Sequence, residues 1–235
     1  MKWSKFSLAI VIALASVFII STTQAKENSL KKGKWALQFE VDREFDLSGF
    51  QGQTLSVKKH TADNRAYRLG LTVYLDVGDG ETLTIYDDTT QRPRNSDRNS
   101  KRLDINLQRI HYTDISAPVN LFYGFGAAAS FSHGKFEDNS HFVIDTITFN
   151  DHYKSVSDSW SAGVSGIFGA EWFFGKTMSL LGEYSTTVSY GGNTRKTESR
   201  QYQEGFTVSS RNSEDKSNSF KISASTVKFG LSIYF

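Results

Sequence analysis

The sequence predicts an all-β chain that closes into one antiparallel up-and-down barrel of eight strands. Three observations lead to this prediction: apolar and polar residues alternate along most of the chain, long and short connectors alternate between these segments, and the chain ends in the alternating segment VKFGLSIYF. A period of two places one apolar and one polar face on each strand. A closed barrel gives all the apolar faces a common side.

Residues 1–25 have the pattern of a secretory signal peptide. MKWSK carries two lysines and no acid, FSLAIVIALASVFII is apolar apart from two serines, and STTQA ends in a small residue. This order predicts cleavage after Ala25, whereas a retained anchor would need ~20 apolar residues. We expect 26–32 to be a short N-terminal segment and 33–235 to be the barrel.

The composition excludes several classes of protein. Of 27 Lys+Arg and 25 Asp+Glu, Lys2 and Lys5 leave with the signal peptide, so the remaining chain is formally neutral. We therefore expect no nucleic-acid partner. The sequence has no Cys, which excludes disulfides, thiolate chemistry and a lipid attachment site. No segment after residue 25 approaches the length of a spanning helix.

Six segments alternate clearly. In the first of them, Trp35, Leu37, Phe39 and Val41 lie opposite Gln38, Glu40 and Asp42, and the other five follow the same pattern. Phe220 and Ile222 have the opposite phase to Phe229, which predicts a bulge near Ser225 and Thr226. The six segments are 33–42, 65–77, 119–132, 158–174, 179–190 and 218–235.

Two further segments are weaker strand candidates. Residues 81–87 are rich in Thr, Ile and Tyr and so favour a strand by composition. Residues 101–113 alternate as far as Leu107 and then change phase to Ile110 and Tyr112, which predicts a bulge near Gln108 and Arg109. These two segments bring the predicted number of strands to eight.

The connectors predict the direction of the strands. The segments 43–64, 88–100, 133–157 and 191–217 are long, whereas 78–80, 114–118 and 175–178 are short. This alternation puts every long loop at one rim and every tight turn, with both chain ends, at the other, as in transmembrane barrels. The small and charged residues on the polar faces suit a narrow polar lumen better than the apolar pocket of a lipocalin-like barrel.

Aromatic residues fall near both predicted rims. Trp35, Trp172, Phe174 and Phe235 lie near the short-turn rim, and Trp160 and Tyr190 lie near the long-loop rim. Transmembrane proteins place such aromatic girdles at the level of the lipid headgroups. Since no backbone group can stay unpaired in lipid, the first and last strands should pair with each other.

With these features the chain resembles the small OmpA/OmpX-like outer-membrane β-barrels of Gram-negative bacteria. The signal peptide, the eight strands and VKFGLSIYF carry the resemblance. It implies that barrel-assembly machinery reads the terminal signal, Phe229, Leu231, Ile233 and Phe235, and that outer-membrane lipid and lipopolysaccharide surround the barrel. It also implies extracellular long loops and periplasmic termini, but no particular activity.

No catalytic site is expected. Outer-membrane lipid A deacylases use a His-x-Ser arrangement, and none of the five histidines fits it. Omptin-like proteases have ten strands, two more than predicted here. His133, His141, Asp145 and His152 share one predicted loop but match no defined metal motif. We expect no enzymatic activity, no cofactor and no metal.

Five charged residues lie on the polar faces of strands that are consecutive around the predicted ring. We expect Arg68 and Lys228 to pair with Glu40, Glu171 and Glu183, because a lone charge in a narrow lumen would be poorly solvated. Two roles are open for this network. It either locks the structure or acts as a gate that exchanges partners to pass small ions.

The predicted loops suggest two kinds of contact. Arg92, Arg94, Arg98, Lys101 and Arg102 form a basic run that suits lipopolysaccharide phosphates. The alternative is a loop kept soluble by its charge. The pieces HFVIDTITF and EGFTVSS alternate and should continue the strands as hairpins, whose edges suit strand addition by an unknown extracellular partner.

Three functional classes follow. The first is a non-enzymatic surface barrel acting in envelope integrity, adhesion or surface interaction. The second is a narrow channel, although eight strands normally leave no continuous aqueous path. The third is a lipid-modifying enzyme, for which the sequence offers no nucleophile with a base in register.

Overall fold

The computed structural model describes residues 29–235 except 47–50, 88–89, 145–146, 204–205 and 225–226. The predicted signal peptide, 1–25, and the predicted bulge at Ser225 and Thr226 lie outside the described residues. Within the described part of the chain, no helix is long and apolar enough to cross a bilayer.

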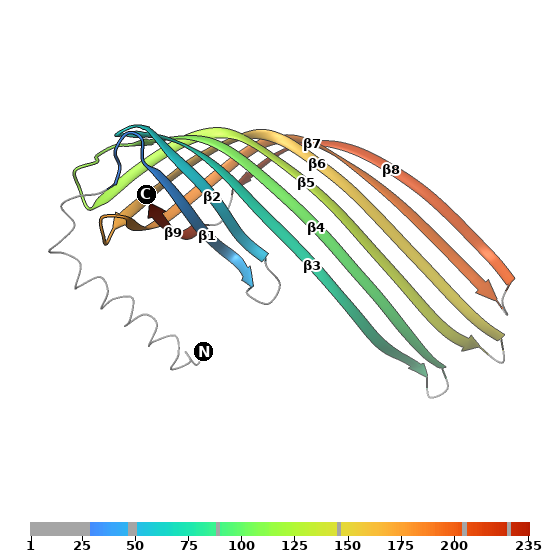
Figure 1. The fold of residues 1–235 in the computed structure, drawn as a ribbon. Coiled ribbons are helices and arrows are strands. Elements are labelled where there is room, and N and C mark those ends of the chain that lie inside the picture. Colours follow the sequence, from blue (N-terminus) through green and yellow to red (C-terminus); the bar gives the residue numbers. More distant parts are fainter. Residues whose placement is uncertain (1–28, 47–50, 88–89, 145–146, 204–205, 225–226) are drawn as a thin grey trace, which may run out of the picture.

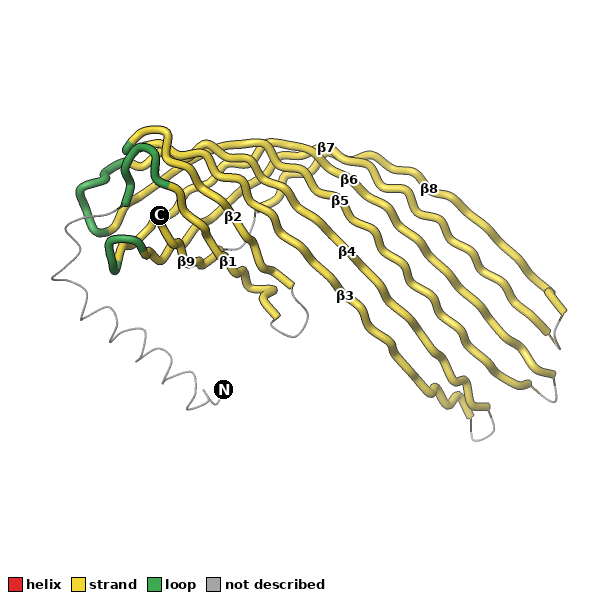
Figure 2. The backbone as a smooth tube through the Cα atoms, in the orientation of Figure 1, coloured by secondary structure: helices red, strands yellow, loops and turns green. Residues whose placement is uncertain are grey.

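Strands make up nearly all of the described chain (Figures 1 and 2). All the pairings between them are antiparallel. The strands are β1 (Trp35–Asp46), β2 (Gln51–Ala62), β3 (Arg65–Asp87), β4 (Thr90–Tyr112), β5 (Val119–Ile144), β6 (Ile147–Phe173), β7 (Met178–Gln203), β8 (Phe206–Ala224) and β9 (Lys228–Tyr234).

The sheet closes into a ring. Each strand from β1 to β7 pairs with the next, and β9 pairs with both β7 and β1. β8 occupies the same side of β7 as β9, because β7 pairs with β9 from Met178 to Glu183 and with β8 from Thr186 to Gln203. β8 and β9 therefore share the eighth position, and the prediction of a closed antiparallel up-and-down barrel of eight strands is confirmed.

One strand was not predicted and another was predicted as two, and these errors cancel in the strand count. Residues 51–62 form β2, where a long loop was predicted, because the strand carries few outward apolar residues. The predicted strands 65–77 and 81–87 are one continuous strand, β3, which runs through the predicted turn at 78–80. Gly78, Asp79 and Gly80 pair there with residues of β4.

The long loops predicted at 88–100, 133–157 and 191–217 are also largely strand. β5 and β6 pair as far as Ile144 and Ile147, and β7 and β8 pair as far as Gln203 and Phe206. The prediction that HFVIDTITF and EGFTVSS continue the strands as hairpins is therefore confirmed. Side chains on both faces of this region meet solvent, so apolar alternation fades although the strands persist.

We call this part of the sheet the extension. β2 pairs with β3 only as far as Val73 within the described residues. Beyond that level β3 to β8 continue as an open, curved sheet with β3 and β8 at its edges (Figure 1). The extension comprises the described residues of 74–102, 132–159 and 193–217.

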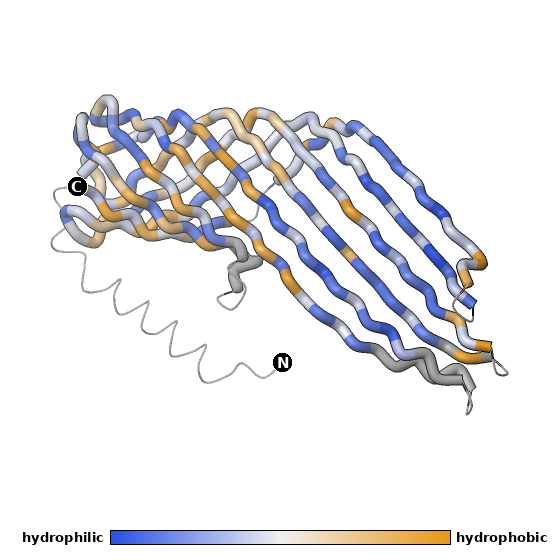
Figure 3. The backbone as a smooth tube through the Cα atoms, turned by 45° about the vertical axis from the view of Figure 1, so that its right-hand side comes forward, coloured by the Kyte–Doolittle hydropathy of each residue, from blue (hydrophilic) through white to orange (hydrophobic). Residues whose placement is uncertain are grey.

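Hydrophobic residues are concentrated in the barrel strands, while the residues of the extension are mostly hydrophilic (Figure 3). Along β3, Leu69 is 47% exposed on the outer face and Arg68 is 3% exposed on the inner face. This alternation agrees with the predicted outward set, and it makes an apolar belt on the outside. The belt ends at a row of direct cross-strand neighbours formed by Val73, Leu103, Phe131 and Trp160.

Apolar side chains also fill the inside of the barrel at its short-turn end. The register of β4 with both neighbours is continuous through Gln108 and Arg109, so the bulge predicted there is wrong. Ile110 and Tyr112 change phase because they point inward and pack into this cluster. Its buried members are Leu30, Ala36, Ile110, Tyr112, Phe122, Ile167, Phe173 and Tyr234.

The two ends of the described chain close the short-turn end of the barrel. Leu30 is fully buried in the cluster, and the hydroxyl of Ser29 donates to the carbonyl of Lys176. Gly33, with φ of 88°, turns the chain into β1. Trp35 and Phe235 exchange backbone hydrogen bonds of 3.1 and 2.9 Å, so the seam between the first and last strands continues to the final residue, as predicted.

Candidate functional site

The barrel interior holds a buried ion pair next to the apolar cluster. Lys58 on β2 lies 2.9 Å from Glu171 on β6, and their side chains are 0% and 1% exposed. Lys58 Nζ also donates to the hydroxyls of Tyr112 at 2.8 Å and Tyr234 at 2.6 Å. All three donors of the ammonium group are therefore used.

The carboxylate of Glu171 is equally well satisfied. Tyr112 donates to Oε2 at 2.6 Å, while Tyr234 and Ser179 donate to Oε1 at 2.7 and 2.5 Å. With Lys58 these bonds join β2, β4, β6, β7 and β9 across the interior. Complete satisfaction is what a buried ion pair needs to offset the loss of water around both charges.

A second group of charges surrounds Arg68 on β3. Its guanidinium contacts Glu40 at 3.0 Å and Glu183 at 2.7 Å. It also donates to Gln108 Oε1 from Nε at 2.9 Å and from Nη2 at 2.6 Å. Lys228 donates to Thr54 at 3.1 Å rather than to a carboxylate.

The structure thus divides the five predicted lumen residues between two groups. Arg68 lies with Glu40 and Glu183, Lys228 lines the same space, and Glu171 belongs to the pair with Lys58. Lys58 is not among the predicted lumen residues because β2 is not among the predicted strands. The alternation of Leu55 and Val57 with Thr54, Ser56 and Lys58 was the signal that could have revealed it.

Little free space is left beside the second group of charges. Around Arg68, Glu183 and Lys228 the cavity measures about 30 Å³, which holds about two water molecules. Within the two groups described, the formal charges of three cations (Lys58, Arg68, Lys228) and three carboxylates (Glu40, Glu171, Glu183) cancel. The arrangement is a filled, neutral interior above an apolar cluster.

On the outer face, the residues predicted to form two aromatic girdles lie at opposite ends of the belt. Trp160 and Tyr190 are half-exposed beside the extension, with ring centroids 6.2 Å apart. Trp172 and Phe174 lie 5.9 Å apart near the short-turn end. Trp35 lies at that end too, and the Lys59 ammonium sits over its ring at 4.7 Å.

The residues of the predicted C-terminal signal lie along the outer face of β9. Phe229, Ile233 and Phe235 are 64%, 39% and 66% exposed, and Leu231 points to the same side. Lys228, Ser232 and Tyr234 point inward from the same strand. In β9 the outward residues have odd numbers. In β8 they have even numbers, as Phe220 and Ile222 show.

The predicted basic run lies in β4 rather than in a loop, so its side chains alternate between two faces. Lys101 points outward from the barrel wall. Arg94, Arg98 and Arg102 point to the inner face, where they contact Asp138, Asp76 and Asp104 at 2.5, 3.8 and 2.8 Å. The side chain of Arg92 is outside the described part. The structure therefore does not gather these residues into one basic patch.

The histidines of the extension are held by neighbouring strands. His133 donates to Asp158 at 2.7 Å on the outer face. Ser132 and Ser159, the adjoining serines, point inward and bond to each other at 2.5 Å, so they form no triad with that pair. Among the described residues, no group of three or more His, Asp or Glu side chains is placed to hold a metal ion, and Asp145 is not described.

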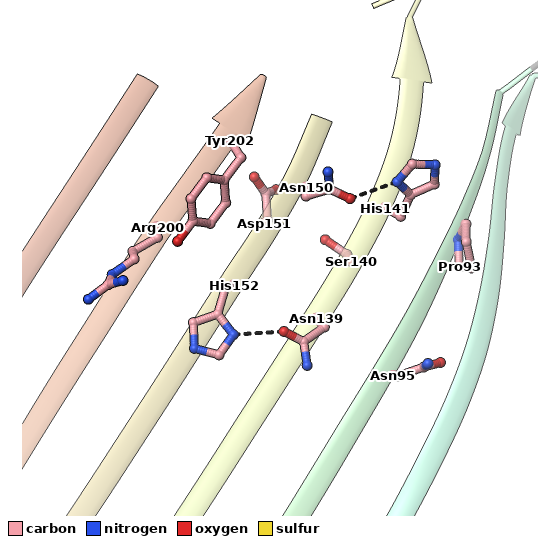
Figure 4. Close-up of a pocket in the computed structure, with 10 residues that line it drawn as sticks. All are labelled: Pro93, Asn95, Asn139, Ser140, His141, Asn150, Asp151, His152, Arg200 and Tyr202. Atoms are coloured by element: carbon pink, nitrogen blue, oxygen red, sulfur yellow. Dashed lines mark hydrogen bonds between the residues drawn. The ribbon is translucent and has the colours of Figure 1, made fainter. Parts of the chain in front are cut away.

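A pocket of about 540 Å³ lies toward the far end of the extension (Figure 4). His141 donates to Asn150 and His152 donates to Asn139, both at 2.7 Å. Arg200 and Tyr202 from β7 complete the same wall (Figure 4). The pocket is polar and open to solvent, and its histidines are engaged with amides.

Comparisons with known proteins find distant structural similarity. No protein-family model matches the chain, and no curated protein matches it. A major outer membrane protein from Thermus thermophilus is similar at 15% identity and a TM-score of 0.46, covering 86% of this chain and 99% of that chain. Acinetobacter baumannii CarO is similar at 12% identity and a TM-score of 0.38, covering 89% of this chain and 100% of that chain. Acinetobacter baumannii CarO2 is similar at 13% identity and a TM-score of 0.36, covering 86% of this chain and 99% of that chain.

Proposed function

We propose that this chain is an integral outer-membrane β-barrel without enzymatic activity, whose extension stands outside the cell and serves surface interaction. The observation that carries the proposal is the contrast between a belt of exposed apolar side chains and a filled, neutral interior. A belt of this kind is stable against lipid but would aggregate in water. The filled interior favours a structural barrel over a conduit.

The dimensions of the belt support the membrane assignment. Trp172 and Trp160 mark its two ends on β6, 12 residues apart. At about 3.3 Å per residue this is about 40 Å along the strand, or about 28 Å along the normal for a tilt of about 45°. That height matches the apolar band of outer-membrane barrels, about 25 Å, with an aromatic residue at each edge.

Fractionation tests the proposal. The protein should be recovered with the outer membrane, and its unheated form should migrate differently from its boiled form in a denaturing gel. Protease added to intact cells should cut within 74–102, 132–159 or 193–217 and spare the barrel. Recovery in the periplasm, with mobility unaffected by heating, would contradict the membrane assignment.

The filled interior also separates the proposal from the channel alternative. The purified protein in a planar bilayer should give no steady conductance. Lys228→Ala should still give none if the interior only locks the barrel, because Arg68 keeps Glu40 and Glu183 paired. Stepwise conductance in the wild type that changes in Lys228→Ala would favour a gated channel instead.

A further inference from the structure

The outer face changes from apolar to polar over two neighbouring rows of side chains. Val73, Leu103, Phe131 and Trp160 form the last apolar row. The next row toward the extension runs from Leu75 through Lys101, His133, Asp158 and Thr194 to Lys216, each paired directly with the next. If the barrel is in the outer membrane, this boundary lies at the headgroups of the outer leaflet.

A groove lies across this boundary. Its volume is about 830 Å³, with Val73, Leu103, Phe131 and Trp160 on its apolar side. Gly192 lies beside the indole, where a Cβ atom would come within 3.0 Å of Trp160 Nε1. The missing side chain therefore leaves room next to the indole, and the volume suits the part of a lipid that lies at the headgroup level.

On the polar side of the groove, one cation among the described residues has no ion-pair partner, since Arg102 lies 2.8 Å from Asp104. His133 is engaged with Asp158, and Lys216 lies 2.9 Å from Glu214. Lys101 also lines the groove, and it makes no ion pair or hydrogen bond with any residue that the structure describes. An unpaired ammonium beside apolar side chains favours an anionic group that arrives with apolar chains attached.

Neutral hydrogen-bonding groups lie on the same rim. Thr194 and Asn218 line the groove on β7 and β8, and the Oδ1 atom of Asn218 would be 3.0 Å from a Cβ at Gly192. A hydroxyl and an amide suit the hydroxyl groups of a sugar. A phosphate would then face Lys101, a sugar would face Thr194 and Asn218, and an acyl chain would face the apolar side.

We propose that this groove binds a phosphorylated glycolipid of the outer leaflet, with its phosphate at Lys101, its sugar at Thr194 and Asn218, and an acyl chain along Phe131 and Trp160. The site rests on the proposed membrane location. It differs from the predicted basic run, of which only Lys101 takes this role on the outer face.

The test uses the intrinsic fluorescence of single tryptophans in the full chain. One variant keeps Trp160 and replaces Trp3, Trp35 and Trp172 with Phe, and its matched control keeps only Trp172, at the other end of the belt. Both are reconstituted in vesicles of brominated phosphatidylcholine, which quenches tryptophans that touch lipid. Unbrominated lipid A, phosphatidylglycerol or phosphatidylcholine is then added at equal mole fractions.

Lipid A should restore Trp160 fluorescence more than the other two lipids, whereas Trp172 should respond to all three alike. Lys101→Ala should weaken this preference about fivefold, the effect of one lysine near a charged surface. Lys154→Ala, a lysine engaged with Glu137 at 3.4 Å, should leave it unchanged. Each variant must show the mobility difference between heated and unheated samples, so that a misfolded barrel is not scored.

The outcomes separate the site from the proposed function. If neither tryptophan is quenched, the chain is not in lipid and the membrane assignment fails. If both are quenched but Trp160 shows no preference for lipid A, the groove is not a site. Equal restoration of Trp160 by lipid A and phosphatidylglycerol would reject the glycolipid and leave a general anionic-lipid surface.

Discussion

The barrel interior and the extension contain the same kind of interaction in opposite surroundings. Arg68 in the barrel contacts two carboxylates and its side chain is 4% exposed, whereas Arg94 in the extension contacts Asp138 and is 52% exposed. Both arginines join neighbouring or facing strands through charge-assisted hydrogen bonds. Of the two side chains, only that of Arg94 is in contact with water.

This difference determines what each pair contributes. A buried pair has lost its hydration, so removing one partner leaves an uncompensated charge that is costly to keep. An exposed pair is replaced by water when it breaks, so it contributes about 0–1 kcal/mol. We therefore expect stability to reside in the barrel, while the extension tolerates change.

The largest effect is expected from breaking the Lys58–Glu171 pair. Glu171→Leu leaves the Lys58 ammonium buried with only two tyrosine hydroxyls, and it should lower the free energy of unfolding by about 3–5 kcal/mol. Urea titration of the barrel in lipid vesicles, followed by tryptophan fluorescence, measures this change. The double variant Lys58→Met/Glu171→Leu should recover most of the loss, and a double variant as unstable as the single one would contradict this account.

A smaller effect is expected at a crowded glycine of the barrel wall. A Cβ atom at Gly126 would lie 1.9 Å from the carbonyl oxygen of Leu107, so Gly126→Ala must push β4 and β5 apart at about 1–3 kcal/mol. Gly78 in the extension has nothing within 4 Å of its Cβ position. Gly78→Ala should therefore stay within about 0.5 kcal/mol in the same urea titration. Equal losses in the two variants would be evidence against the tighter packing of the barrel wall.

A still smaller effect is expected from an exposed pair. Arg94→Met removes two hydrogen bonds to Asp138 and should change the free energy of unfolding by at most about 1 kcal/mol. Arg68→Met in the barrel is the matched comparison, and it should lose more than about 3 kcal/mol because Glu40 and Glu183 stay buried together. Comparable losses at the two positions would mean that burial does not separate these regions.

The smallest effect concerns one carboxylate of the extension. The hydrogen bond from Lys135, with a further one from Lys154, lowers the pKa of Glu137 below its usual range. Since the folded pKa is below the unfolded one, its contribution is present at neutral pH and is lost as the pH falls through the folded pKa. Carbon-13 NMR of the carboxyl group should show this lowered pKa, and Lys135→Ala should raise it. An unchanged titration in that variant would remove Lys135 as the cause.

Much of the barrel could be predicted from the sequence because its outer face carries apolar side chains and much of its inner face carries polar ones. Leu69, Leu71 and Val73 alternate with Arg68, Gly70 and Thr72, and this contrast gives both the strand and its orientation. β2 was missed because only Leu55 and Val57 mark its outer face clearly. Because β2 was not predicted, Lys58 was not predicted as the partner of Glu171.

The extension could not be predicted in the same way. There both faces meet water, so residues such as Arg94, Ser96 and Arg98 carry no apolar alternation and resemble a loop. The run Gly78-Asp79-Gly80 has the composition of a turn. It stays extended because it pairs with β4, as do the residues before and after it. The change of phase at Ile110 and Tyr112 is real, but its cause is an inward apolar cluster and not a bulge, and both give the same pattern in the sequence.

The unequal lengths of the strands have a mechanical consequence. β1 and β2 have 12 residues each, whereas β3 to β7 have 23 to 27 and run from the barrel to the far end of the extension. Hydrogen bonds between antiparallel strands lie perpendicular to them. A force applied at the tip along the strands therefore loads many of these bonds in shear together. If the extension stands at the cell surface as proposed, it would pass tension to the barrel without breaking these bonds one at a time.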